Sequence, residues 1–117
     1  PLEEAAVRAL LPFDAVLLGM GDDGHIASLF PGSPALARGL DPDAEAYVLQ
    51  VPEPHGSPPL PRITLTLAAL IQARGVVVLI SGEGKRAVVE RALAGEDLPV
   101  RALLCQDRAP VRILWSP

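Results

Sequence analysis

Val76-Val77-Val78-Leu79-Ile80-Ser81-Gly82-Glu83-Gly84-Lys85 is the stretch that decides the fold class. Five apolar residues in succession, 76–80, predict a short strand buried on both faces, as strands of parallel sheets are. The glycine-rich segment 81–84 predicts a turn, and residues 85–94 predict a helix that ends at Gly95. A buried strand followed directly by a helix indicates the repeating unit of a parallel α/β sheet.

The rest of the chain continues this alternation of helix and strand. Helical patterns occupy residues 2–11, 65–74 and, as a single turn, 25–30. Strand patterns occupy 13–18, 46–51 and 111–115, and 102–105 fits either a helical turn or a strand. Residues 52–61 include five prolines and predict an extended surface loop. The sequence therefore predicts the α/β class: a Rossmann-like, mostly parallel sheet with helices on both faces.

Composition restricts the possible functions. The chain has 117 residues, which is the usual length of one domain. Its formal net charge is −4 and it has no basic tract, and this charge pattern argues against nucleic acid as a partner. Its apolar runs are too short for a membrane helix, and no signal sequence opens it. A single cysteine, Cys105, excludes an internal disulfide and is expected to be a small core residue. These features predict a cytoplasmic protein.

The segment after the first predicted strand carries the clearest chemical pattern: Gly19-Met20-Gly21-Asp22-Asp23-Gly24-His25-Ile26-Ala27-Ser28-Leu29-Phe30-Pro31-Gly32. An aspartate two residues before a histidine can orient its ring for general acid–base work. An ordinary turn with a surface histidine explains the same residues equally well. The spacing of Asp22, Asp23 and His25 is poor for a metal site. The glycines also fit the dinucleotide-binding pattern G-x-G-x-x-G, but Asp22 and Asp23 would then face the negatively charged pyrophosphate, which argues against a dinucleotide.

Three motifs in order make the chain resemble the 6-phosphogluconolactonases. They are the loop just quoted, the segment Arg62-Ile63-Thr64-Leu65-Thr66, and the turn Ser81-Gly82-Glu83-Gly84-Lys85. The related glucosamine-6-phosphate deaminases share the Gly-x-Asp-Gly-His core but continue with an additional acid. Residues 28–31 here, Ser-Leu-Phe-Pro, contain none, so the lactonase branch fits better.

The resemblance implies a role for each matching residue. His25 corresponds to the catalytic histidine and Asp23 to its accompanying acid, while Lys85 and Arg62 correspond to positions that hold the substrate phosphate. The reaction would be hydrolysis of 6-phospho-D-glucono-1,5-lactone, with no metal and no organic cofactor. Backbone N–H groups around Gly21 and Gly24 are candidate stabilisers of the oxyanion.

Lys85 and Arg62 also have simpler interpretations. Lys85 could be a solvated charge, although a cation is slightly unfavourable where a helix begins. It is the only lysine beside nine arginines, which weakly indicates a specific need for lysine. Arg62 could be an ordinary surface arginine, and His55 is expected to be a solvated loop residue.

Length is the main departure from the family. The resemblance implies that residues 1–117 form a single domain, the C-terminal portion of a longer lactonase domain. Two alternatives stay open: a sugar-phosphate isomerase or deaminase, and a non-catalytic phosphosugar-binding fragment. The expected partner is a small phosphosugar lactone, and the sequence does not predict an oligomeric state.

Overall fold

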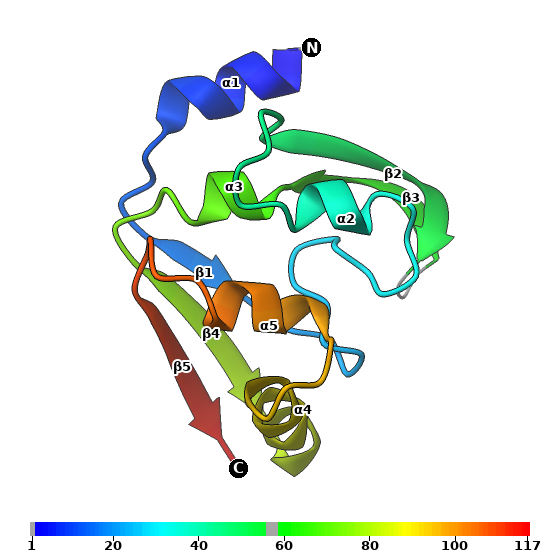
Figure 1. Cartoon of the computed structure of the whole chain (residues 1–117), viewed down its shortest axis with the longest axis vertical. Coiled ribbons are helices and arrows are strands. Elements are labelled where there is room, and N and C mark those ends of the chain that lie inside the picture. The colour runs from blue at the N-terminus through cyan, green and yellow to red at the C-terminus, as the bar shows by residue number, and fades with distance from the viewer. Residues whose placement is uncertain (1, 56–58) are drawn as a thin grey trace.

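The computed structural model describes residues 2–55 and 59–117 and contains a three-stranded parallel sheet, seen at the lower left of Figure 1 with β5 at its outer edge. The strands β1 (Val16–Leu18), β4 (Val76–Ser81) and β5 (Val111–Ser116) lie in the order β1-β4-β5. Both pairings are parallel, and Val76 of the central strand β4 lies opposite Val16 of β1 and Val111 of β5. The predicted α/β class with a mostly parallel sheet is confirmed.

Two helices cover one face of this sheet. They are α4 (Glu83–Leu93) and α5 (Pro99–Leu104), and their buried valines pack with Val76, Val78 and Ile80 in the aliphatic core. The sequence predicts burial of Val88, Val89, Ala92 and Leu93 in this helix. The first three are buried, whereas Leu93 is 59% exposed, so the prediction is wrong for Leu93. The strand expected at 111–115 is also present, and residues 102–105, left undecided between helix and strand, belong mostly to α5.

The opposite face of the sheet is open in the described part of the chain. Leu17, Leu79 and Leu114 point to this side, because strand residues alternate between faces, and each is at least 44% exposed. Helices were expected on both faces, but within residues 2–55 and 59–117 the packed helices α4 and α5 lie on one face.

An antiparallel hairpin stands beside the sheet, formed by β2 (Val48–His55) and β3 (Leu60–Leu65) (Figure 1). The loop predicted over residues 52–61 is therefore wrong at both ends, because β2 continues to His55 and β3 already begins at Leu60. A two-stranded hairpin has only edge strands, and an edge strand tolerates prolines because one side of its backbone needs no partner. The pairing register shifts between Val51 and His55, within the proline-containing part.

The remaining helices are short or terminal. Helix α1 (Leu2–Leu10) matches its expectation closely, whereas α3 (Leu67–Leu70) is only the middle of the predicted helix. Leu65 belongs to β3, and the Thr66 side chain caps α3 by accepting from the Ala69 N–H at 3.3 Å. Helix α2 (Leu36–Gly39) was not expected, and residues 25–30 form a compact turn instead of a helix.

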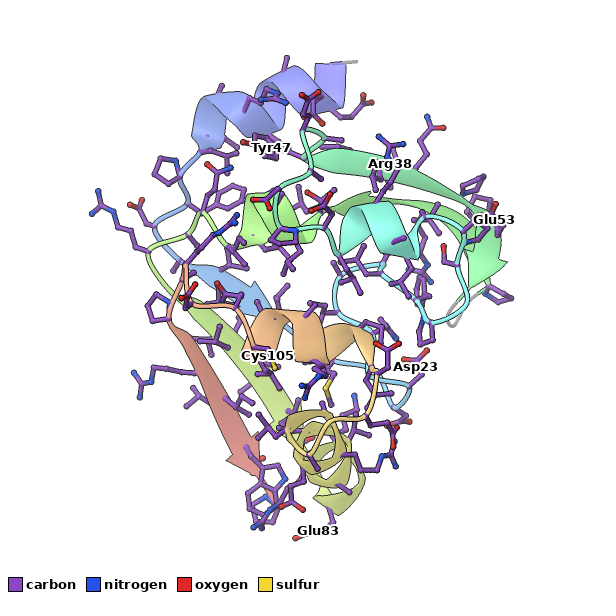
Figure 2. The ribbon with its side chains drawn as sticks, viewed as in Figure 1. Asp23, Arg38, Tyr47, Glu53, Glu83 and Cys105 are labelled. Carbon is purple, nitrogen blue, oxygen red and sulfur yellow. The ribbon has the colours of Figure 1, made fainter. Side chains whose placement is uncertain are left out.

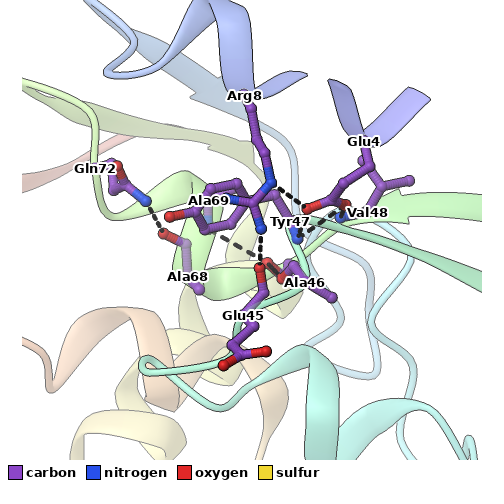
Figure 3. A network of polar contacts seen from close by, with 10 residues as sticks. Glu4, Arg8, Glu45, Ala46, Tyr47, Val48, Ala68, Ala69 and Gln72 are labelled. Atoms are coloured by element: carbon purple, nitrogen blue, oxygen red, sulfur yellow. Dashed lines mark hydrogen bonds and ion pairs between the residues drawn. The ribbon is translucent and has the colours of Figure 1, made fainter. Parts of the chain in front are cut away.

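Helix α1 is fastened to the start of the hairpin through one carboxylate (Figure 3). Glu4 accepts hydrogen bonds from the backbone N–H groups of Tyr47 and Val48, each at 2.8 Å. Arg8 pairs with Glu4 at 3.2 Å and lies over the Tyr47 ring.

No helix in residues 2–55 and 59–117 is long and apolar enough to cross a membrane.

Candidate functional site

Two loops meet at the carboxyl ends of neighbouring parallel strands. The loop that begins at Gly19 follows β1, and the turn at Gly82 follows β4. Because β1 and β4 pair in parallel, the segments that leave them lie at the same edge of the sheet. A cavity of about 750 Å³ opens there and is lined by residues of both segments, including His25 and Lys85.

The His25 and Asp23 side chains form a close pair within the first loop; Asp23 is labelled in Figure 2. His25 Nδ1 lies 2.6 Å from Asp23 Oδ1, and the His25 backbone N–H donates to the same oxygen at 3.0 Å. An Nδ1–H donated to the carboxylate leaves Nε2 as the ring atom available for proton transfer. The expected pairing of these two residues is therefore present in the structure.

The environment of Asp23 favours its charged form. Partial burial alone would raise the pKa of this carboxyl group, but the hydrogen bonds from His25 and the charge of the imidazolium outweigh it. The pKa of Asp23 therefore lies below its ordinary value. Asp23 remains a carboxylate, and so an acceptor for the ring N–H, at neutral pH.

Glycine at position 21 gives the histidine ring its space. A Cβ atom at Gly21 would lie 2.1 Å from His25 Cε1 and 2.2 Å from Nδ1, so any larger residue would displace the imidazole. Gly24 has φ +82°, and a Cβ there would come within 3.0 Å of Leu98. Both glycines are therefore needed for the shape of the loop.

The N–H groups of these two glycines are engaged inside the loop. Gly21 N–H donates to the His25 carbonyl at 2.9 Å, and Gly24 N–H donates to the Gly21 carbonyl at 3.0 Å. An oxyanion role for either group would require exchange of its present partner. In this structure the glycines shape the loop and place the ring, which is a different contribution from the one expected.

Neighbouring elements hold the loop on two sides. The Val100 N–H at the start of α5 donates to the Gly24 carbonyl at 2.9 Å. The buried Thr64 hydroxyl accepts from the Ser28 N–H at 3.0 Å and donates to the Leu65 carbonyl. The hairpin strand β3 is thereby joined directly to the loop that carries His25.

Phe30 connects the histidine with Arg62. The centroids of the His25 and Phe30 rings are 4.5 Å apart, and Arg62 Cζ lies 5.7 Å from the Phe30 centroid. Phe30 is only 3% exposed, so its position is fixed by the core. Phe30 therefore contacts both His25 and Arg62 from a fixed position in the core.

Lys85 lines both of the cavities that His25 lines. It is the third residue of α4, because the helix begins at Glu83, two residues earlier than expected. A second cavity of about 470 Å³ adjoins the first and places Lys85 and Arg62 around one space with the acidic loop. Its lining residues are Gly21, Asp22, Asp23, His25, Ala27, Phe30, Arg62 and Lys85.

The predicted site residues therefore come together around this space. His25, Asp23, Gly21, Lys85 and Arg62 line it, and Gly24 holds the loop behind it. Ala27, which also lines it, has a left-handed φ of 49°, an uncommon conformation for a residue other than glycine that marks local strain.

Other residues considered in the sequence lie elsewhere. His55 ends β2 and pairs with Leu60, which places its backbone in the hairpin instead of a loop. Cys105 is exposed at the end of α5, so its expected place in the core is wrong (Figure 2). Within the described ranges, no three His, Cys, Asp or Glu residues cluster closely enough to hold a metal ion.

Sequence reasoning missed the supporting residues Phe30 and Thr64. A signal for Thr64 existed, because Arg62 and Thr64 are two apart on a strand and so share one face. Phe30 lies in the motif quoted at 19–32, but its contacts with His25 and Arg62 depend on how the loop folds back on the core, which the sequence does not show.

A family model described as glucosamine-6-phosphate isomerases/6-phosphogluconolactonase matches residues 2–115. The chain belongs to this family. A 6-phosphogluconolactonase from Caulobacter vibrioides is 51% identical over 113 residues, which cover 97% of this chain and 48% of that protein. The human 6-phosphogluconolactonase is 39% identical, over 90% of this chain and 43% of its own length.

Solved structures of the family agree with the fold. The crystal structure of a 6-phosphogluconolactonase from Shewanella baltica matches with a TM-score of 0.84 at 35% identity, covering 98% of this chain and 51% of that one. A monomeric glucosamine-6-phosphate deaminase shares the fold, with a TM-score of 0.70 at 23% identity. The chain spans about half the length of the curated relatives it matches.

Proposed function

We propose that the natural protein carrying this chain hydrolyses 6-phospho-D-glucono-1,5-lactone to 6-phosphogluconate. The observation that carries the proposal is the His25–Asp23 pair placed in one cavity with Lys85 and Arg62. Relatives up to 51% identical across this chain bear the name of that activity. The family match and the chemistry of the cavity thus support the same reaction.

In the proposed reaction His25 acts as the general base. Its Nε2 takes a proton from water while the water oxygen attacks the lactone carbonyl carbon. The tetrahedral intermediate collapses with cleavage of the bond from C1 to the ring oxygen, which receives the proton from the imidazolium. Asp23 holds the ring and stabilises its charged form. A positioned base of this kind contributes about 10²- to 10⁴-fold to the rate.

The phosphate has a separate place in the proposal. Lys85 and Arg62 supply two positive charges to a dianionic group, and Lys85 stands in the first turn of α4, where free N–H groups and the helix dipole also favour an anion. Asp22 and Asp23 line the same space and repel an anion. We therefore place the phosphate on the side of Lys85 and Arg62, away from the carboxylates.

A second candidate is a sugar-phosphate isomerase or deaminase, because the family model includes both activities. It is disfavoured by Ser28-Leu29-Phe30-Pro31, which offers no additional acid. An assay for ammonia release from glucosamine 6-phosphate separates the two candidates.

The direct experiment compares lactone hydrolysis by the natural protein with that by residues 1–117 alone, each corrected for spontaneous hydrolysis. We propose that residues 1–117 are one part of a longer lactonase domain, since the relatives are about twice as long. The natural protein should then be active and the isolated segment nearly inactive. A natural protein that binds phosphosugars without turnover would favour the non-catalytic alternative.

A further inference from the structure

We propose that Trp115 is a positioning residue for substrate phosphate, acting through the first turn of α4; the inference rests on the proposed function. Its indole Nε1–H donates to the Gly82 carbonyl at 2.8 Å. The neighbouring Ser116 carbonyl accepts from the Gly82 N–H at 2.9 Å. Strand β5 therefore contacts both backbone polar groups of Gly82, the N-cap residue that precedes α4.

Gly82 needs such an external support. It is the N-cap of α4, yet it has no side chain that could accept a hydrogen bond from the first turn. Its φ of +89° suits glycine, and the space that a Cβ would occupy is open, with no atom within 4 Å. Two hydrogen bonds with β5 hold it, and the Arg86 N–H of α4 donates to the same Gly82 carbonyl at the longer distance of 3.3 Å.

The face of the indole also contacts the helix. Arg86 Cζ lies 4.8 Å from the centre of the Trp115 ring, and Arg86 Nε pairs with Glu90 at 3.1 Å. Arg86 is thereby held toward β5. Adjacent helical residues point about 100° apart, from 3.6 residues per turn, so this fixes the direction of Lys85. Lys85 lines the cavity beside His25.

The contact between Trp115 and the first turn, together with the burial of Val88, Val89 and Ala92 further along α4, thus sets the direction in which Lys85 points. Rotation of the first turn would move Lys85 away from the cavity that it shares with Arg62. Trp115 touches neither the proposed reacting water nor His25, so its effect on the reaction should pass through the phosphate alone.

The test is Trp115→Phe in the natural protein, which keeps an aromatic ring for Arg86 but removes the N–H donor. Loss of one such hydrogen bond should raise KM for the phosphorylated lactone about 2- to 10-fold. The kcat value and the hydrolysis of unphosphorylated gluconolactone should not change. Phe13→Leu is the matched control: it alters a partly buried aromatic residue of the core away from α4 and should leave KM unchanged.

A double mutant separates positioning from general damage. In a Lys85→Ala background, Trp115→Phe should cause little additional loss, because the group that it positions is gone. Additive losses, or equal losses on both lactones, would overturn the inference. If Lys85→Ala impairs both lactones equally, the assignment of Lys85 to the phosphate is wrong. If Lys85→Ala distinguishes the two lactones but Trp115→Phe does not, only the positioning role of Trp115 is wrong.

Fluorescence gives a second test that needs no Trp115 variant. Trp115 is the only tryptophan of this chain and contacts the turn that carries Lys85. In the natural protein, with any tryptophan outside residues 1–117 replaced by phenylalanine, titration with inorganic phosphate should shift the emission, and it should not shift the emission of the same protein carrying Lys85→Ala. An emission spectrum unmoved by saturating phosphate, or moved equally in both proteins, would contradict the inference.

Discussion

His25 and Asp23 are joined twice: Asp23 Oδ1 lies 2.6 Å from the ring Nδ1 and accepts the backbone N–H of the same histidine at 3.0 Å. A single carboxylate oxygen therefore fixes both the backbone and the ring of the proposed general base. Gly21 completes the arrangement, because only a residue without a side chain leaves room for the ring.

Asp23→Asn should show what this pair contributes to stability at different pH values. The pKa of Asp23 is lowered in the fold, so its carboxylate stabilises the folded state above the ordinary carboxyl pKa. That contribution is lost as the pH falls through the lower pKa of the folded state. The urea midpoint of the variant should lie below that of the wild type at pH 7, and the difference should disappear in acid. A difference that does not change with pH would contradict the pairing.

Gly21→Ala should impair the reaction by moving the imidazole. A Cβ would overlap the ring, with a distance of 2.1 Å to Cε1, so His25 must leave its position beside Asp23. We expect kcat to fall by about 10-fold or more, as the positioned base is worth about 10²- to 10⁴-fold. Gly75→Ala is the matched control, since a Cβ there meets no atom within 4 Å and its φ is ordinary. Equal kcat values for the two variants would count against the steric role of Gly21.

Exhaustive chelation should leave the activity of the natural protein unchanged. The proposed reaction uses water and an imidazole, and Asp23 already serves the histidine ring. The measurement is the lactonase rate before and after treatment with EDTA, followed by addition of zinc. Activity that disappears with EDTA and returns with zinc would make Asp22, Asp23 and His25 metal ligands instead.

Much of the sheet could be predicted from the sequence, because its signals are local. The apolar run at 76–80 and the glycines at 82 and 95 define β4 and the limits of α4 within two residues. The hairpin was missed for a physical reason. Prolines argue against central strands, and only the tertiary structure reveals that β2 and β3 are both edge strands.

The site was predicted in its charged residues and missed in its supports. Asp23 and His25 stand out by their chemistry and spacing, and Arg62 and Lys85 were singled out by the family resemblance. Phe30 and Trp115 were missed because their contacts are with residues distant in the sequence. The oxyanion expectation for Gly21 and Gly24 depended on free N–H groups. Whether a loop N–H is free depends on the loop's own hydrogen bonds, which the sequence does not show.

In the proposed reaction Lys85 binds the phosphate, while His25 performs the chemistry. The decisive measurement is a two-by-two comparison of Lys85→Ala and His25→Ala in the natural protein, on phosphorylated and unphosphorylated gluconolactone. A charge-assisted contact is worth about 1.5–3 kcal/mol, so Lys85→Ala should raise KM for the phosphorylated lactone about 10- to 150-fold. It should leave the unphosphorylated lactone unaffected, whereas His25→Ala should lower kcat on both with little change in KM. If Lys85→Ala impairs hydrolysis of both lactones equally, Lys85 acts on the carbonyl or on the fold, and its assignment to the phosphate is wrong.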